Sequence, residues 1–163
     1  EHTARAIARN VHISWKHGIE ISRELRFHST EYAKKFLQDV VELKKPVPFR
    51  RYWRDVGHKP GMSAGRYPEK AAREFLRLVK AVEANAQVKG LNTASLKIIK
   101  LITNRAPKAP SAGRKRHTAK HSHIEIEVQE GKIRKAAAEK KKVEKSTKAA
   151  PPSAEKPITG EKQ

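Results

Sequence analysis

The chain has 163 residues, and its 37 lysines and arginines against 17 aspartates and glutamates give a net charge of +20. There is no cysteine, which excludes disulfides and thiolate metal sites. No run reaches the roughly 18 apolar residues of a membrane span, and no apolar signal segment opens the sequence. We therefore expect a soluble, intracellular protein whose charge is neutralised by a polyanion, with RNA, DNA and an anionic membrane surface as candidates.

The positive charge is concentrated in three segments. Residues 44–70, 104–123 and 131–163 each carry a net charge of +6. These segments show no clear helical or strand periodicity, whereas the periodic segments together carry the remaining +2. Charge that gathers on loops and on a tail indicates that those parts contact a polyanion.

The first predicted elements are a short edge strand over residues 4–12 and a helix over residues 15–27. Ser14 is the predicted N-cap of this helix. Its apolar face is predicted to consist of Gly18, Ile21 and Leu25, with Ile19 alongside. 

A second helix is predicted to begin at Ser29 or Thr30, with Glu31 in its first turn. Pro46 and Pro48 prevent its continuation. Its apolar residues recur at helical spacing, which predicts a buried face made of Ala33, Phe36, Leu37 and Val40.

Pro68 suits the first turn of a third helix, and Gly90 is its predicted stop, with Leu91 folding back. The predicted buried stripe of this helix consists of Ala72, Phe75, Leu76, Val79, Val82 and Ala86.

After the third helix the apolar period changes to two. On the first strand Leu96, Ile98 and Ile102 are predicted to share one face, interrupted by Lys100, with Ile99 and Leu101 opposite. On the second strand the apolar residues alternate with polar ones, as Ile124, Ile126 and Val128 against Glu125, Glu127 and Gln129. The two strands predict one long antiparallel hairpin, because only a basic stretch links them.

The predicted fold class is α+β, with three helices packed on a small antiparallel sheet and a long extended β-hairpin. Residues 1–130 are expected to form a globular domain that includes the hairpin extension, at about residues 104–123. Residues 131–163 are a basic, low-complexity tail that we expect to be disordered.

The long connection over residues 44–70 is the first candidate binding site, because irregular loops of this length are usually functional or disordered. Its arginines stand next to aromatic residues, a combination that suits phosphate contact and base stacking on RNA. We expect Phe49 and Trp53 to be anchored in the protein's own core, since such side chains are rarely left in water. The predicted RNA-binding residues of this loop are Arg50, Arg51, Tyr52, Arg54, His58, Lys59, Arg66 and Tyr67.

The hairpin tip over residues 104–123 is the second candidate site. It has no acid and no large apolar residue, which predicts an arm that becomes ordered on nucleic acid; the alternative is a flexible, solvated loop. The predicted RNA-binding residues here are Arg105, Lys108, Arg114, Lys115, Arg116, His117 and Lys120.

Metal binding and catalysis find little support. His121 and His123 lie on one predicted strand face with His117 nearby, but the surrounding cations would repel a metal ion. There is no Gly-x-Ser-x-Gly element and no phosphate-binding glycine loop. The acidic residues are expected to form surface pairs, such as Glu20 with Glu24 and Glu69 with Arg73. We predict no catalytic residue, no metal, no cofactor and no small-molecule substrate.

Five runs of the sequence resemble one known family. They are ISWKHGIEISRELR, VPFRRY, AGRYPEKAAREFLRLVKAVEANAQVKGL, NRAPK and HIEIEV. In this order they resemble the universal large-subunit ribosomal protein twenty-two family, archaeal and eukaryotic type (number seventeen in eukaryotic naming). The resemblance covers roughly residues 1–128.

The resemblance implies a structural protein of the cytoplasmic ribosome that binds 23S-type ribosomal RNA and lines the nascent-peptide exit tunnel with its hairpin. Its partners would be large-subunit rRNA, neighbouring ribosomal proteins and, transiently, the nascent peptide, with no membrane. By their positions in the matching hairpin segment, the resemblance assigns the tunnel-lining role to the cations of the hairpin and to small residues at its tip. The residues that would line the tunnel are Ala109, Ser111, Ala112, Gly113, Arg114, Lys115 and Arg116.

Two other classes of protein are the alternatives. A DNA-architectural or chromatin-associated basic protein would need a minor-groove wedge or a helix that reads a groove, and neither is convincing here. An enzyme acting on RNA would need paired carboxylates or a histidine with a carboxylate in a cleft, and no such set is visible.

Overall fold

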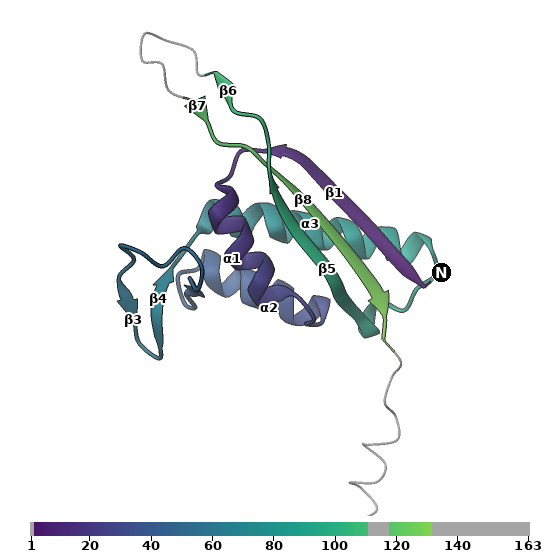
Figure 1. The fold of residues 1–163 in the computed structure, drawn as a ribbon. Coiled ribbons are helices and arrows are strands. Elements are labelled where there is room, and N and C mark those ends of the chain that lie inside the picture. The colour runs from purple at the N-terminus through teal and green to yellow at the C-terminus, as the bar shows by residue number, and fades with distance from the viewer. Residues whose placement is uncertain (1, 111–117, 132–163) are drawn as a thin grey trace, which may run out of the picture. The chain divides into compact units, whose positions relative to one another are not determined.

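The structure is a computed structural model, which describes residues 2–110 and 118–131 except for the side chains of 109 and 110. The elements in chain order are β1 (Thr3–Val11), α1 (Trp15–Leu25), α2 (Thr30–Val41), β2 (Val47–Pro48), β3 (His58–Lys59), β4 (Met62–Arg66), α3 (Glu69–Val88), a 3-10 turn (Thr93–Ser95), β5 (Leu96–Arg105), β6 (Ala109–Pro110), β7 (Thr118–Ala119) and β8 (Ser122–Glu130). Three helices with antiparallel sheets confirm the predicted α+β class (Figure 1).

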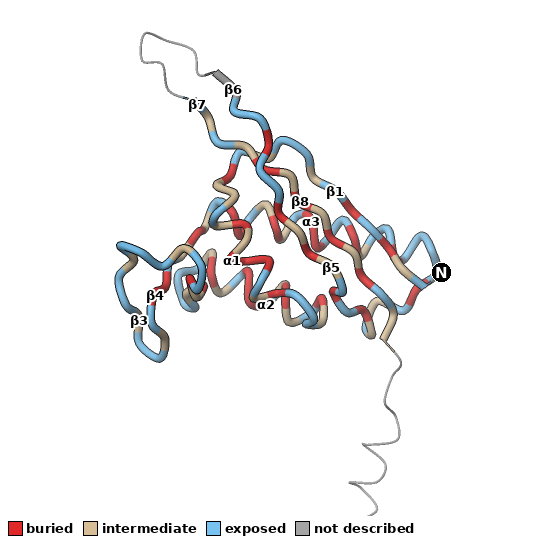
Figure 2. The backbone as a smooth tube through the Cα atoms, viewed as in Figure 1, coloured by how far each residue is buried: buried red, intermediate tan, exposed pale blue. Residues whose placement is uncertain are grey.

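The main sheet has the strand order β1-β8-β5, and both pairings are antiparallel. β1 is therefore an edge strand, as predicted. α1 packs against β5 and α3 against β1, so the helices cover one face of the sheet (Figure 1). The alternate residues Ile124, Ile126 and Val128 of β8 are fully buried on that face, and Figure 2 shows the same alternation of buried and more exposed positions along the strands.

A β-bulge at Ile99 changes the face of every later residue in β5. Ile98 pairs with Val128 and Lys100 with the next residue, Glu127, so Ile99 is one extra residue on this strand. The side chains that follow are moved to the opposite face. As a result Leu101 is buried and Ile102 only half-buried, and the prediction that Ile102 shares the face of Ile98 was wrong.

α1 ends two residues earlier than predicted because Phe27 adopts a left-handed backbone, with φ of 70°. Its N–H donates to the carbonyl of Ile98, which ties the end of α1 to β5. Ser14 occupies the N-cap position, as predicted, but its side chain makes no capping hydrogen bond. 

α2 and α3 follow the sequence prediction closely. Ser29 caps α2 by accepting a hydrogen bond from the N–H of Tyr32, and the four predicted core residues are buried. α3 ends in a Schellman motif, in which the N–H of Leu91 donates to Ala86 and that of Gly90 to Gln87. In its buried stripe Leu78 replaces Leu76, which is only half-buried.

The connection over residues 44–70 is not wholly irregular, which corrects the sequence interpretation. β2, β4 and β3 form a second antiparallel sheet in that order, with Val47 opposite Arg66 and His58 opposite Ala64. The strands are too short to give a readable alternation in the sequence. Their role is to bring the two ends of the loop together beside α1.

Beyond the main sheet, β6 pairs with β7 and extends the hairpin away from the helices (Figure 1). The predicted tip residues 111–117 and the predicted tail from residue 132 lie outside the described residues. No helix in the described part of the chain is both long and apolar enough to cross a membrane.

Candidate nucleic-acid interface

A buried glutamate organises the arginine-rich loop, which is the part of the 44–70 connection that contains Arg50, Arg51 and Arg54. Glu20 of α1 is 1% exposed, and its carboxylate accepts hydrogen bonds from three consecutive backbone N–H groups. The donors are Arg50 at 3.2 Å, Arg51 at 2.8 Å and Tyr52 at 2.8 Å. The predicted surface pair of Glu20 with Glu24 was therefore wrong, because the turn of this loop needs an acceptor for its N–H groups.

Aromatic contacts hold the same loop against α1. Phe49 is buried and meets His17 edge to face, with ring centroids 5.5 Å apart. Tyr52 meets Trp15 in the same way at 5.3 Å. Phe49 is thus anchored as expected, but Trp53 is 57% exposed and the expectation for it was wrong. Tyr52 supplies the anchor at this turn instead.

The predicted cations of this loop lie on its outer surface. Arg50, Arg51, Arg54, His58 and Arg66 are exposed, and Lys59 and the rings of Tyr52 and Tyr67 are half-buried. Three of the cations lie over aromatic rings, with Arg51 above Tyr52, Lys59 above Tyr67 and Arg66 above Phe49 at 5.4 to 5.9 Å. These contacts restrict the long side chains while their charged ends remain accessible.

The base of the hairpin presents a second group of cations. Arg105, Lys108 and Lys120 are exposed. Of Ala109, also predicted, only the backbone is described, in β6. The other predicted hairpin residues lie outside the described residues, namely Ser111, Ala112, Gly113, Arg114, Lys115, Arg116 and His117.

Some cations of the molecule are paired with acids, whereas most of the predicted ones are not. On the uncovered face of the main sheet, Arg5 lies 3.4 Å from Glu127, and Lys100 lies 3.2 Å from Glu125. On α3, Arg73 pairs with Glu69, as predicted. Among the predicted binding residues that the structure describes, Arg50 alone has its charged group within 4 Å of a carboxylate, that of Glu24 at 3.7 Å. The other predicted cations make no ion pair within the described residues, a property that they share with cations elsewhere, such as Lys80 of α3 and Lys97 of β5.

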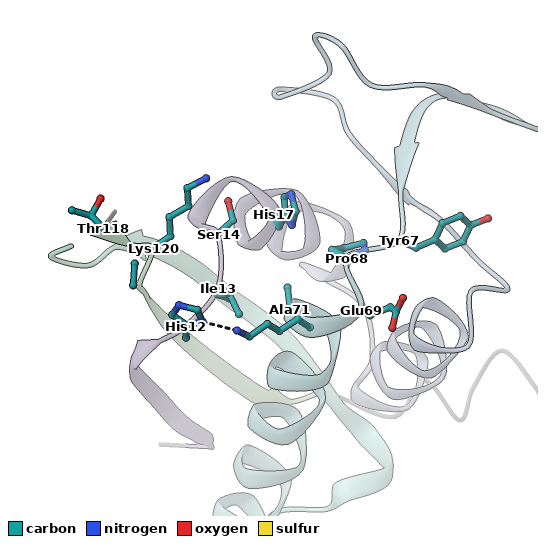
Figure 3. Close-up of a pocket in the computed structure, with 12 residues that line it drawn as sticks. His12, Ile13, Ser14, His17, Tyr67, Pro68, Glu69, Ala71, Thr118 and Lys120 are labelled. Atoms are coloured by element: carbon teal, nitrogen blue, oxygen red, sulfur yellow. Dashed lines mark hydrogen bonds between the residues drawn. The ribbon is translucent and has the colours of Figure 1, made fainter. Parts of the chain in front are cut away.

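A hollow of about 580 Å³ lies between the end of the long connection, at Tyr67, and Lys120 of the hairpin (Figure 3). Its walls come from the start of α1, the start of α3 and the strand that returns from the hairpin. His17 lies in it, and burial, together with the nearby charges of Arg66 and Lys120, lowers the pKa of this imidazole. Arg66 of the loop and Lys120 of the hairpin thus act on one side chain, although 54 residues separate them in the sequence.

Several residues of this region were missed in the sequence. They are His12, Lys16, His17 and Lys70. His12, Lys16 and His17 stand among neutral or mixed neighbours, and only the tertiary fold places them beside the basic segments. Lys70 is the last residue of the basic segment 44–70 but was not among the residues predicted to bind. No three His, Asp or Glu side chains come together as a metal site anywhere in residues 2–110 and 118–131.

Fold and charge together define a class: a small α+β domain with a hairpin extension and with exposed cations on its long connection and its hairpin base. Residues 6–129 match the family model described as ribosomal protein L22p/L17e. The chain belongs to this family, which confirms the predicted resemblance. It is accordingly a ribosomal protein, which is a structural component and not an enzyme. The alternative of a chromatin-associated protein is therefore rejected.

Archaeal relatives agree with this assignment. The chain is similar to the large ribosomal subunit protein uL22 of Methanocaldococcus jannaschii, with 46% identity over 108 residues, covering 64% of this chain and 69% of the relative. It is 47% identical over 103 residues to that of Cenarchaeum symbiosum, covering 62% and 68%. For Methanoculleus marisnigri the identity is 48% over 101 residues, covering 60% and 66%.

Proposed function

We propose that this chain is a structural constituent of the large subunit of the cytoplasmic ribosome, where it binds 23S-type rRNA. The observation that carries this proposal is the set of predicted binding cations at the surface of the loop and the hairpin base, of which Arg50 alone is paired with an acid in the described part of the chain. On the sheet and on α3, by comparison, Arg5, Lys100 and Arg73 are paired with acids. Cations that are left unpaired on fixed elements are the groups that neutralise phosphates and release counterions.

The geometry of the loop and of the hairpin indicates which residues contact rRNA in this proposal. The loop rests on Glu20 and on aromatic contacts, so it offers a preformed surface whose guanidinium groups can bind phosphates with little loss of entropy. The contacts to rRNA are assigned to the predicted residues Arg50, Arg51, Tyr52, Arg54, His58, Lys59, Arg66, Tyr67, Arg105, Lys108, Arg114, Lys115, Arg116, His117 and Lys120.

The hairpin is assigned to the wall of the nascent-peptide exit tunnel, where it would contact rRNA and, transiently, the nascent chain. The paired strands β5 and β8 continue into β6 and β7 beyond the helices, which supports a projecting arm. The tip itself carries three consecutive cations, Arg114, Lys115 and Arg116, between small residues. Residues 1–130 form the rRNA-binding domain in this proposal, and the tail over residues 131–163 adds a further charge of +6.

A photo-crosslinker placed at Ala112 tests the tunnel assignment in reconstituted large subunits. Capture of 23S-type rRNA or of a stalled nascent chain is the expected result. A matched crosslinker at Ala84, which is exposed on α3, should not reach the nascent chain. Capture of the same outer-surface proteins from both positions would defeat the assignment, whereas failure of the chain to sediment with large subunits would defeat the ribosomal role.

A further inference from the structure

A second hollow adjoins the one around His17. It has a volume of about 320 Å³, and its lining includes Trp15, Arg105 and Lys108. Both hollows are lined by Ser14 and Lys120, so they lie side by side at the start of α1. 

The smaller hollow has the chemistry of a phosphate site. Four cations contribute to its lining, Lys16, Arg105, Lys108 and Lys120, and no acidic residue does. The first turn of α1 also begins here, with no acidic residue in that turn and no side-chain cap on its N–H groups. Backbone N–H groups and several ammonium or guanidinium groups that converge on one hollow favour an anion.

The larger hollow is different, since much of its wall is apolar or aromatic. Ile13, Pro68 and Ala71 contribute carbon surface, and the rings of His17 and Tyr67 lie at its margin (Figure 3). Its one acidic residue, Glu69, is paired with Arg73. Because burial lowers the pKa of His17, its ring is neutral at physiological pH and is suited to contact with an uncharged, flat ligand.

Two histidines separate the hollows. His12 lines the larger one and His121 the smaller one, and their rings meet edge to face with centroids 5.1 Å apart. Nζ of Lys70 lies 2.5 Å from Nδ1 of His12 and holds that ring in place; this contact is the dashed line at His12 in Figure 3. Nδ1 of His121 is buried and makes no hydrogen bond within the described part of the chain.

We propose that the two hollows bind one unstacked nucleotide of single-stranded RNA, with its phosphate in the basic hollow and its base in the larger one. The site rests on the proposed rRNA-binding function and adds to it a single-stranded nucleotide as the ligand. Duplex RNA cannot use it, because a paired base is not free to leave its stack.

The test compares two ligands of matched charge on the full chain, a hexanucleotide of adenosine and a polyphosphate. Ala119→Phe narrows the larger hollow and changes no charge, and Ala84→Phe on the exposed face of α3 is the matched control. Ala119→Phe should lower the affinity for the hexanucleotide about tenfold, in line with the loss of one stacked base. It should leave the affinity for polyphosphate unchanged. The control should change neither.

Three outcomes separate the possibilities. The base site is overturned if the two ligands bind with equal affinity. It is also overturned if Ala119→Phe does not alter the affinity for the hexanucleotide. If rRNA binding persists in either case, the proposed function stands without this inference. If a thermal melt shows that Ala119→Phe is poorly folded, Thr118→Tyr replaces it, because it narrows the same hollow from an exposed position. The affinities for the hexanucleotide and for polyphosphate are then measured in the same way.

Discussion

The carboxylate of Glu20 accepts the backbone N–H of Arg51 at 2.8 Å, so an acid buried under the loop holds a cation that points out of it. The N–H groups on either side, those of Arg50 and Tyr52, donate to the same carboxylate. One side chain of α1 thereby fixes the turn from which three predicted RNA contacts project. We therefore expect stability and RNA binding to be coupled at this point.

Glu20→Ala should lower the free energy of unfolding by about 2–4 kcal/mol, because three N–H groups lose a charged acceptor. Affinity for rRNA should fall as well, since the arginines are no longer held in place. Urea denaturation and filter binding measure the two effects. Glu24→Ala is the control, because Glu24 lies closer to the surface and makes one long ion pair with Arg50. Equal, small effects of both substitutions would mean that Glu20 does not organise the loop.

Gly18 lies where α1 packs closely against β5. A Cβ placed on it would lie 2.5 Å from Cγ2 of Thr103, whose hydroxyl shares a hydrogen bond with that of Ser22. Gly18→Ala should therefore cost about 1–3 kcal/mol through overpacking. Thr103→Ser removes the clashing methyl group and keeps the hydroxyl, so it should restore much of the loss in the double variant. Thermal melts of the wild type, the two single variants and the double variant provide the measurement. Additive losses of stability in the double variant would contradict this packing.

The sequence predicted elements whose determinants are local and left out those that depend on packing. The caps and apolar spacing of α2 and α3 identified both helices, because those signals lie within one or two turns. The bulge at Ile99 reverses the faces of β5 and has no local signature. The buried role of Glu20 was hidden for the same reason, since its partners lie 30 residues away in the chain. The surface cations of the loop and the hairpin base could be predicted because their density is itself a sequence property, and their contact with RNA stays a prediction.

His17 should make stability depend on pH in one direction. Its pKa is lowered in the folded protein, so the unfolded chain binds the proton more tightly. Stability is then lost as pH falls through about 6.5, and the loss is complete below the lowered value. His17→Gln should remove this component between pH 7.5 and pH 5, whereas exposed His58→Gln should not. Unfolding curves with the same pH dependence in wild type and His17→Gln would contradict the assignment.

Phe75 is fully buried on α3 and is one of the largest side chains of the core. Phe75→Ala should cost about 3–5 kcal/mol from lost burial and the cavity left behind, enough to unfold a domain of this size. Lys80→Ala, at an exposed position of the same helix, should change the melting temperature little. Two equally mild substitutions would show that the core does not depend on this face of α3.

The salt dependence of rRNA binding tests whether the unpaired cations act on phosphates. If they neutralise about six to eight phosphates, the logarithm of affinity should fall against the logarithm of salt concentration with a slope of roughly −4 to −7. Arg51→Gln and Arg54→Gln should each reduce that slope by about one, because each removes one phosphate contact from an exposed, unpaired position. Arg73→Gln removes the same charge from α3, where it is paired with Glu69, and should leave the slope unchanged. Filter binding from low to moderate salt provides the measurement. A flat dependence, or an equal change of slope in all three variants, would mean that net charge rather than the placement of these cations determines binding.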